Sequence, residues 1–142
     1  MNGEQQIERT MYTLEHYQQQ ADALTKQRQM IFASLEEHMR AKITITENKK
    51  QKEGQEILVP VGGNAFIPAK SAQPDKVFIG IGSDVIIEDT ADGAIEKINS
   101  TIKVLEEAGR RIDARISELE RQIAELNLVL EKASAQHGIR GH

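Results

Sequence analysis

The stretch Ile95–Ala133, IEKINSTIKVLEEAGRRIDARISELERQIAELNLVLEKA, carries the pattern that decides the fold. Apolar side chains return in it at alternating steps of three and four residues, with Gly109 as the one exception among twelve positions. These positions are Ile95, Ile98, Ile102, Leu105, Gly109, Ile112, Ile116, Leu119, Ile123, Leu126, Leu130 and Ala133. A sustained spacing of 3.5 residues indicates a coiled-coil seam, whereas a helix on a globular core usually has a wider apolar stripe. We therefore expect a long coiled-coil helix over residues 91–135, with Thr90 as its N-cap.

The first third of the chain repeats this spacing. No Pro or Gly occurs between Gln5 and Lys50, and eight of twelve positions at the same steps are apolar. The twelve are Ile7, Thr10, Leu14, Tyr17, Ala21, Leu24, Arg28, Ile31, Leu35, His38, Lys42 and Ile45. The β-branched tract Ile43–Thr46 favours a strand by propensity, but the seam runs through it and no helix breaker precedes Gly54. We therefore expect a first helix over residues 5–50.

The two seams have equal length. Each spans 39 residues, from Ile7 to Ile45 and from Ile95 to Ala133, which corresponds to about 57 Å of helix. Equal arms joined by a small middle can pair antiparallel within one chain, so that residue numbers on facing layers sum to about 140. Parallel dimers of each helix are the competing arrangement, but they leave the matched lengths unexplained. In the antiparallel register Gly109 lies opposite Ile31, where it either admits that side chain closely or lets the helix bend.

The middle of the chain, residues 56–88, has short runs rich in β-branched residues. The runs cover 56–61, 65–69, 76–81 and 84–88, and Gly62-Gly63-Asn64 and Gly82-Ser83 separate the members of each pair. This order predicts two β-hairpins. Isolated hairpins are marginal in water, so we expect these strands to find partners on other chains. The residues expected to mediate subunit assembly are Ile57, Val59, Val61, Phe66, Ile67, Val77, Ile79, Ile81, Val85 and Ile87.

The composition gives little sign of catalytic or ligand chemistry. There is no Cys, the net charge is −4, and no apolar run reaches the roughly 20 residues that span a bilayer. Gly80-Ile81-Gly82 precedes a strand-like run, so a hairpin turn explains it better than a nucleotide loop. The four histidines, His16, His38, His137 and His142, lack metal-site spacing. We expect no enzyme, metal, cofactor, membrane span or secretory signal, and a cytoplasmic location.

A basic stretch lies near the end of the first helix. It contains Arg40, Lys42, Lys49, Lys50 and Lys52, but no interleaved aromatic residue. A nucleic-acid contact is conceivable. Cations at a helix end, which complement the helix dipole, are the favoured interpretation, and no nucleic-acid partner is expected.

Some apolar residues lie outside the seams at the open end of the expected hairpin. Met11 and Tyr12 do so on the first helix, and Leu128 and Val129 on the second. The antiparallel register places Met11 opposite Val129 and Tyr12 opposite Leu128. The four residues either pack against a slightly splayed seam or form an exposed patch that binds partners, and the sequence leaves both alternatives open.

The order of elements, together with two short motifs, resembles the α class of the prefoldin family. The motifs are the stretch Ile57–Gly63 before the first hairpin turn and Val77–Gly82 before the second. Phe66-Ile67, Val85–Glu88 and Ala94-Ile95 also fit, and the resemblance covers essentially the whole chain. Two hairpins, as opposed to one, point to the α class.

The resemblance implies an α+β, mainly α fold: a long antiparallel coiled-coil hairpin, in one domain over residues 1–142, with two β-hairpins between the helices. It further implies a hexamer of two α and four β subunits, whose hairpins join into an intersubunit β-barrel. The family is an ATP-independent chaperone of the archaeal and eukaryotic cytosol that binds unfolded proteins at its coiled-coil tips and passes them to a group II chaperonin. A structural coiled-coil scaffold that binds one folded partner is the alternative function, and a hydrolase finds no support in the residues.

Overall fold

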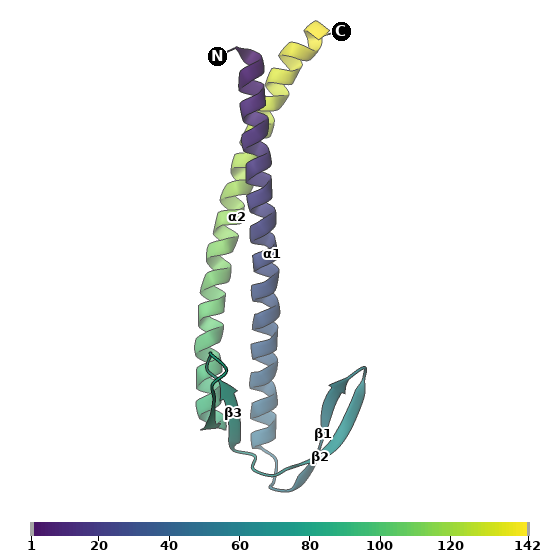
Figure 1. Cartoon of the computed structure of the whole chain (residues 1–142), viewed down its shortest axis with the longest axis vertical. Helices are drawn as coiled ribbons and strands as arrows, with labels where there is room; N and C mark the ends of the chain where they lie inside the picture. The colour runs from purple at the N-terminus through teal and green to yellow at the C-terminus, as the bar shows by residue number, and fades with distance from the viewer. Residues whose placement is uncertain (1, 142) are drawn as a thin grey trace. The chain divides into compact units, whose positions relative to one another are not determined.

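The computed structural model describes residues 2–141, and the side chains of residues 2–136. Two long helices are separated along the chain by two antiparallel strand pairs (Figure 1), which confirms the mainly α fold class. The elements are α1 (Gly3–Lys49), β1 (Gln55–Gly62), β2 (Ala65–Ser71), β3 (Lys76–Gly80), β4 (Ile86–Thr90) and α2 (Ala91–Gly141). The Ile43–Thr46 tract is helical, and α2 continues past residue 135, where the sequence pattern ended.

The chain divides into two compact units, each of which pairs a segment of α1 with a segment of α2. The first comprises residues 1–33 and 106–142, and the second comprises residues 34–105 with both hairpins. In the first unit Ile116 and Leu119 are buried, while the facing seam residues of α1 are partly covered. This narrow line of covered side chains is the seam that the 3.5-residue spacing predicts.

Antiparallel pairing within the first unit follows the predicted register. A Cβ built on Gly109 would lie 3.8 Å from Cγ2 of Ile31, so these two residues face each other as expected. The seam residue Arg28 turns outward and its Nη1 donates to Oδ1 of Asp113 at 3.1 Å. The numbers of these pairs sum to 140 and 141, which confirms the register to within one residue.

Close packing does not explain the glycine in this layer. A distance of 3.8 Å from Ile31 is ordinary van der Waals contact, so a methyl group at position 109 would fit. The expectation that Gly109 is needed to admit Ile31 is therefore wrong. The alternative, a point at which the helix bends, stays a prediction.

The second unit contains both hairpins. β1 pairs with β2 through the partners Val59 and Ile67, and its register shifts between Pro60 and Gly62. Gly63 and Asn64 connect these strands with positive φ angles of 59° and 60°, as a two-residue type I′ turn requires. β3 pairs with β4 in a regular antiparallel register from Lys76↔Thr90 to Gly80↔Ile86.

The start of α2 is capped as predicted. The Thr90 hydroxyl Oγ1 accepts a hydrogen bond from the backbone N–H of Gly93 at 3.1 Å, which satisfies one of the amides that a helix start leaves free. Asp92, in the first turn, accepts hydrogen bonds from Nζ of Lys49 at 2.9 Å. The hydrogen bond to Asp92 raises the pKa of Lys49 and ties the last turn of α1 to the first turn of α2.

Asp89 fixes the same helix start from the preceding strand. It forms an ion pair with Lys97, and its Oδ1 accepts the backbone N–H of Thr90 at 2.8 Å. The hydrogen bond from Lys97 and then that from Thr90 lower the pKa of this carboxyl group. The carboxylate also occupies the space over Gly93, because Cγ of Asp89 would lie 2.7 Å from a Cβ built on that glycine.

Gly93 and Gly109, two of the glycines of α2, should therefore respond in opposite ways to replacement by alanine. Ala is better than Gly inside a helix by about 1 kcal/mol, so Gly109→Ala should raise the free energy of unfolding by about 0.5–1 kcal/mol. Gly93→Ala should lower it by about 1 kcal/mol, because overpacking against Asp89 costs about 1–3 kcal/mol and exceeds that gain. Urea unfolding followed by circular dichroism at one protein concentration measures both; a stabilised Gly93→Ala variant would contradict the packing at Asp89.

Candidate interaction surfaces

The open end of the helix pair, in the first unit, carries exposed apolar side chains. Met11 is 55% exposed and Tyr12 is 77% exposed. Both line a shallow depression, together with the partly buried seam residues Leu14 and Leu130. The remaining lining residues are Glu8, Glu15 and Gln18. We call this hollow, defined by these seven residues, the distal depression.

The other two residues singled out at this end lie outside the distal depression. Leu128 and Val129 are 56% and 51% exposed, so neither is packed away in the seam. Met11 instead lines a common hollow with Leu130, one residue beyond its expected partner. Sequence reasoning missed Leu14 and Leu130 as surface groups because their spacing had already assigned them to the seam.

The first hairpin, β1 with β2, has apolar side chains on both of its faces. Cross-strand pairing places Val59 with Ile67 on one face, while Leu58 and Phe66 point to the other because neighbouring strand residues alternate. All four are exposed, from 40% for Val59 to 65% for Leu58. Exposed apolar area of this kind on a two-stranded ribbon is typical of surfaces that bind further strands or chains.

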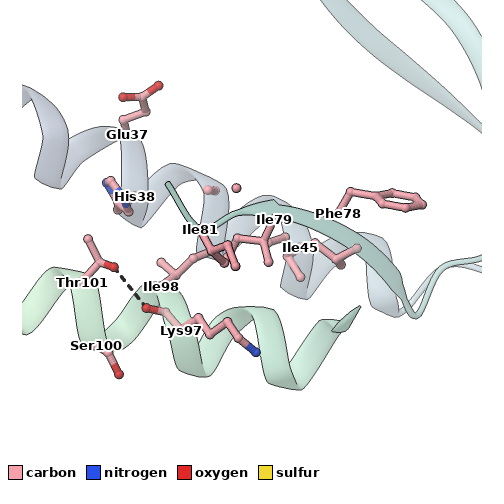
Figure 2. A pocket seen from close by; sticks show the side chains of 13 residues that line it. Glu37, His38, Ile45, Phe78, Ile79, Ile81, Lys97, Ile98, Ser100 and Thr101 are labelled. Carbon is pink, nitrogen blue, oxygen red and sulfur yellow. Dashed lines mark hydrogen bonds between the residues drawn. The ribbon is translucent and has the colours of Figure 1, made fainter. Parts of the chain in front are cut away.

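The second hairpin, β3 with β4, has one covered face and one free face. Val77, Ile79 and Ile87 share the partly buried face, and Figure 2 shows Ile79 near Ile45 and Ile98 of the helices, with Phe78 pointing away. Phe78 and Ile86, on the other face, are 64% and 67% exposed.

A charged side chain lies over part of this free face. Nζ of Lys76 lies 5.5 Å from the Phe78 ring centroid and 3.2 Å from Oε1 of Glu88. The face therefore presents an aromatic ring beside an ion pair.

Of the residues expected to mediate assembly, the structure exposes some and partly covers others within the same chain. Val59, Val61, Phe66, Ile67, Ile81 and Val85 are exposed, whereas Ile57, Val77, Ile79 and Ile87 are partly covered. Sequence reasoning missed three exposed strand residues, Leu58, Phe78 and Ile86. It also missed exposed apolar residues along the helices, namely Met30, Phe32, Met39, Ile43 and Val104. Their exposure depends on which side of each strand or helix is covered. A strand that is apolar on both faces shows no alternation of apolar and polar residues, so its sequence does not predict which face is covered.

An open groove of about 750 Å³ separates the second hairpin from the helices of its own unit (Figure 2). Three of its polar members, Lys97, Thr101 and His38, have structural partners. Lys97 pairs with Asp89, and the Thr101 hydroxyl donates to the backbone carbonyl of Lys97 at 3.3 Å. Nδ1 of His38 donates to the backbone carbonyl of Ser34 at 2.7 Å, as a polar seam-edge residue. Glu37, the acidic residue of the groove, points away from His38 in Figure 2, so among the side chains that line the groove no acid faces a base.

The part of the chain that the structure describes holds neither a cluster of metal ligands nor a helix that could span a membrane. No group of three or more potential metal ligands occurs among its side chains, and His137 and His142 lie outside them. Within residues 2–141, neither helix carries an apolar stretch long enough to cross a bilayer. In the basic stretch Lys49 pairs with Asp92 and Lys50 with Glu47, which favours the helix-end interpretation.

The chain is similar to known proteins of one family. The family model described as prefoldin subunit matches residues 17–136. The prefoldin subunit alpha of Methanococcus aeolicus is 31% identical over 96% of this chain and 94% of its own length. A putative prefoldin subunit alpha of Aquifex aeolicus is 31% identical over 87% of this chain and 83% of its own length. The cryo-electron-microscopy structure of filamentous PFD from Methanocaldococcus jannaschii aligns with a TM-score of 0.68 and 26% identity, over 80% of this chain and 94% of that one.

Proposed function

The chain belongs to the prefoldin family as an alpha subunit, a chaperone-type subunit, and we propose that it holds unfolded proteins without ATP. The observation that carries this proposal is the set of exposed apolar side chains at the open end, Met11, Tyr12, Leu128 and Val129. Unfolded chains present scattered apolar side chains and no fixed shape, so shallow apolar surfaces suit them better than a shaped pocket does.

Affinity in this proposal comes from several arms acting together. One shallow apolar contact binds only weakly, but several arms in one assembly raise the effective concentration of each further contact. We therefore propose that the chain works in a hexamer of two alpha and four beta subunits. The two exposed apolar faces of the first hairpin support this role, because joining a β-barrel between subunits would cover them and would pair their free edges.

The same proposal includes transfer and location. We propose that the assembly acts in the cytoplasm and passes bound clients to a group II chaperonin. Membership of the prefoldin family supports both statements, and neither requires a metal, a nucleotide or a nucleic-acid partner.

The test combines an assembly measurement with an aggregation assay. Native mass spectrometry with a beta-type prefoldin subunit should give a mixed hexamer. That assembly should suppress the aggregation of several unrelated denatured proteins without ATP, at a near-stoichiometric ratio. The opposite result would be a saturable complex with one folded protein and no protection of denatured proteins. That result would identify the chain as a coiled-coil scaffold and would overturn the proposal.

A further inference from the structure

The distal depression combines an apolar floor with two acidic side chains. Its floor is formed by Met11, Tyr12, Leu14 and Leu130, and Glu8 and Glu15 stand beside it. Both glutamates are exposed, and neither forms a salt bridge within the part of the chain that the structure describes. Two free negative charges therefore lie next to an uncovered apolar surface.

The spacing of the glutamates places them on both sides of the apolar residues along α1. Glu8 and Glu15 are seven residues apart, which is about two helical turns and about 10.5 Å along the same helix face. Met11 and Tyr12 lie between them. An extended peptide advances about 3.3 Å per residue, so the carboxylates match two side chains about three residues apart in such a peptide.

Among the side chains that the structure describes, those of residues 2–136, no basic residue lines the distal depression. Arg9 and Lys132 are the nearest basic residues in sequence to the lining groups of their helices, and both lie outside the hollow. The third polar lining residue, Gln18, is uncharged. A negatively charged peptide would therefore meet repulsion there without compensation, and a positively charged one would meet two carboxylates.

We infer that the distal depression selects segments of unfolded protein in which apolar side chains are flanked by Lys or Arg about three residues apart. This inference rests on the proposed function, because it names the class of client that the same open end binds. The apolar centre lies against Met11 and Tyr12, and the flanking cations reach Glu8 and Glu15. Exposed charge pairs are weak individually, so the preference should be about two- to tenfold and should shrink with added salt.

The experiment compares three short fluorescent peptides with the same apolar centre. Two leucines are flanked on each side by Lys, by Gln or by Glu, and binding to the chain of residues 1–142 is followed by fluorescence anisotropy. We expect the Lys peptide to bind about fivefold more tightly than the Glu peptide at low salt, with the Gln peptide between them. A raised salt concentration should bring the three dissociation constants together.

A matched pair of variants locates the effect. Glu8→Gln with Glu15→Gln should bring the ratio between the Lys and Glu peptides close to one. Glu106→Gln with Glu120→Gln removes the same charge from exposed positions of the same unit outside the depression, and should leave most of the ratio.

The outcomes separate this inference from the proposed function. Equal binding of all three peptides, or an unchanged ratio in the Glu8→Gln, Glu15→Gln variant, would overturn the inference and leave the proposed function intact. Failure of all three peptides to bind, together with failure to protect denatured proteins, would overturn both.

Discussion

Replacing Met11, Tyr12, Leu128 and Val129 with glutamine should abolish most of the protection that the assembly gives to denatured proteins. All four side chains are more than half exposed, so the free energy of unfolding should change little. Each apolar side chain contributes about 1.5–3 kcal/mol when fully buried. If each arm loses even a part of this binding free energy, the affinity of the whole assembly falls by much more, because the arms bind one client together. We expect that more than tenfold as much of the variant is needed to halve light scattering from an aggregating client.

The control removes equally exposed apolar residues elsewhere. Met30, Phe32, Met39 and Ile43 are residues of α1 that are 55–72% exposed and do not line the distal depression. Their replacement by glutamine removes four large apolar side chains of similar exposure. Protection should then remain within about twofold, since surface substitutions away from a binding site have small effects. Equal loss of protection in both variants would show that clients bind along the whole arm.

The long helices were predictable because their signal is redundant. Twelve seam positions in each arm repeat one spacing, so single exceptions such as Gly109 or Arg28 do not obscure it. Matching the lengths of two such seams fixed the antiparallel register to within one residue, as the Arg28–Asp113 ion pair shows. The Thr90 cap was predictable for a local reason, because its hydroxyl accepts the Gly93 N–H three residues later.

The faces of the hairpins could not be predicted in the same way. A strand that is covered on one side alternates between apolar and polar residues, but the sequence around Leu58 and Val59 is apolar at successive positions. Which face a second strand or helix covers depends on tertiary packing, and only the structure separates exposed Phe78 from partly covered Ile79. The role of Glu8 and Glu15 could likewise not be predicted, because the sequence gives no sign of the hollow between the helices.

Substitutions in the first hairpin, β1 with β2, should weaken assembly with a beta-type subunit. Replacing Leu58, Val59, Phe66 and Ile67 with threonine keeps β propensity but removes apolar area from both faces. If assembly covers these side chains, loss of about half their burial should weaken the mixed assembly with a beta-type subunit by at least about 100-fold. Sedimentation or native mass spectrometry over a dilution series measures this shift. Far-ultraviolet circular dichroism should change little, because the residues are exposed in the single chain and most of the signal is helical.

This variant and the variant of the open end control each other. Substitution at the open end should leave the mass of the assembly unchanged while protection falls, because Met11 and Val129 lie on the helix arms in the first unit and the hairpins in the second. Substitution in the hairpin should lower the mass first, and protection should fall as a consequence, because separated arms lose their multivalency. A hairpin variant that assembles normally would contradict the assembly role of β1 and β2. A hairpin variant that dissociates yet protects fully would show that one arm suffices, and would remove multivalency from the mechanism.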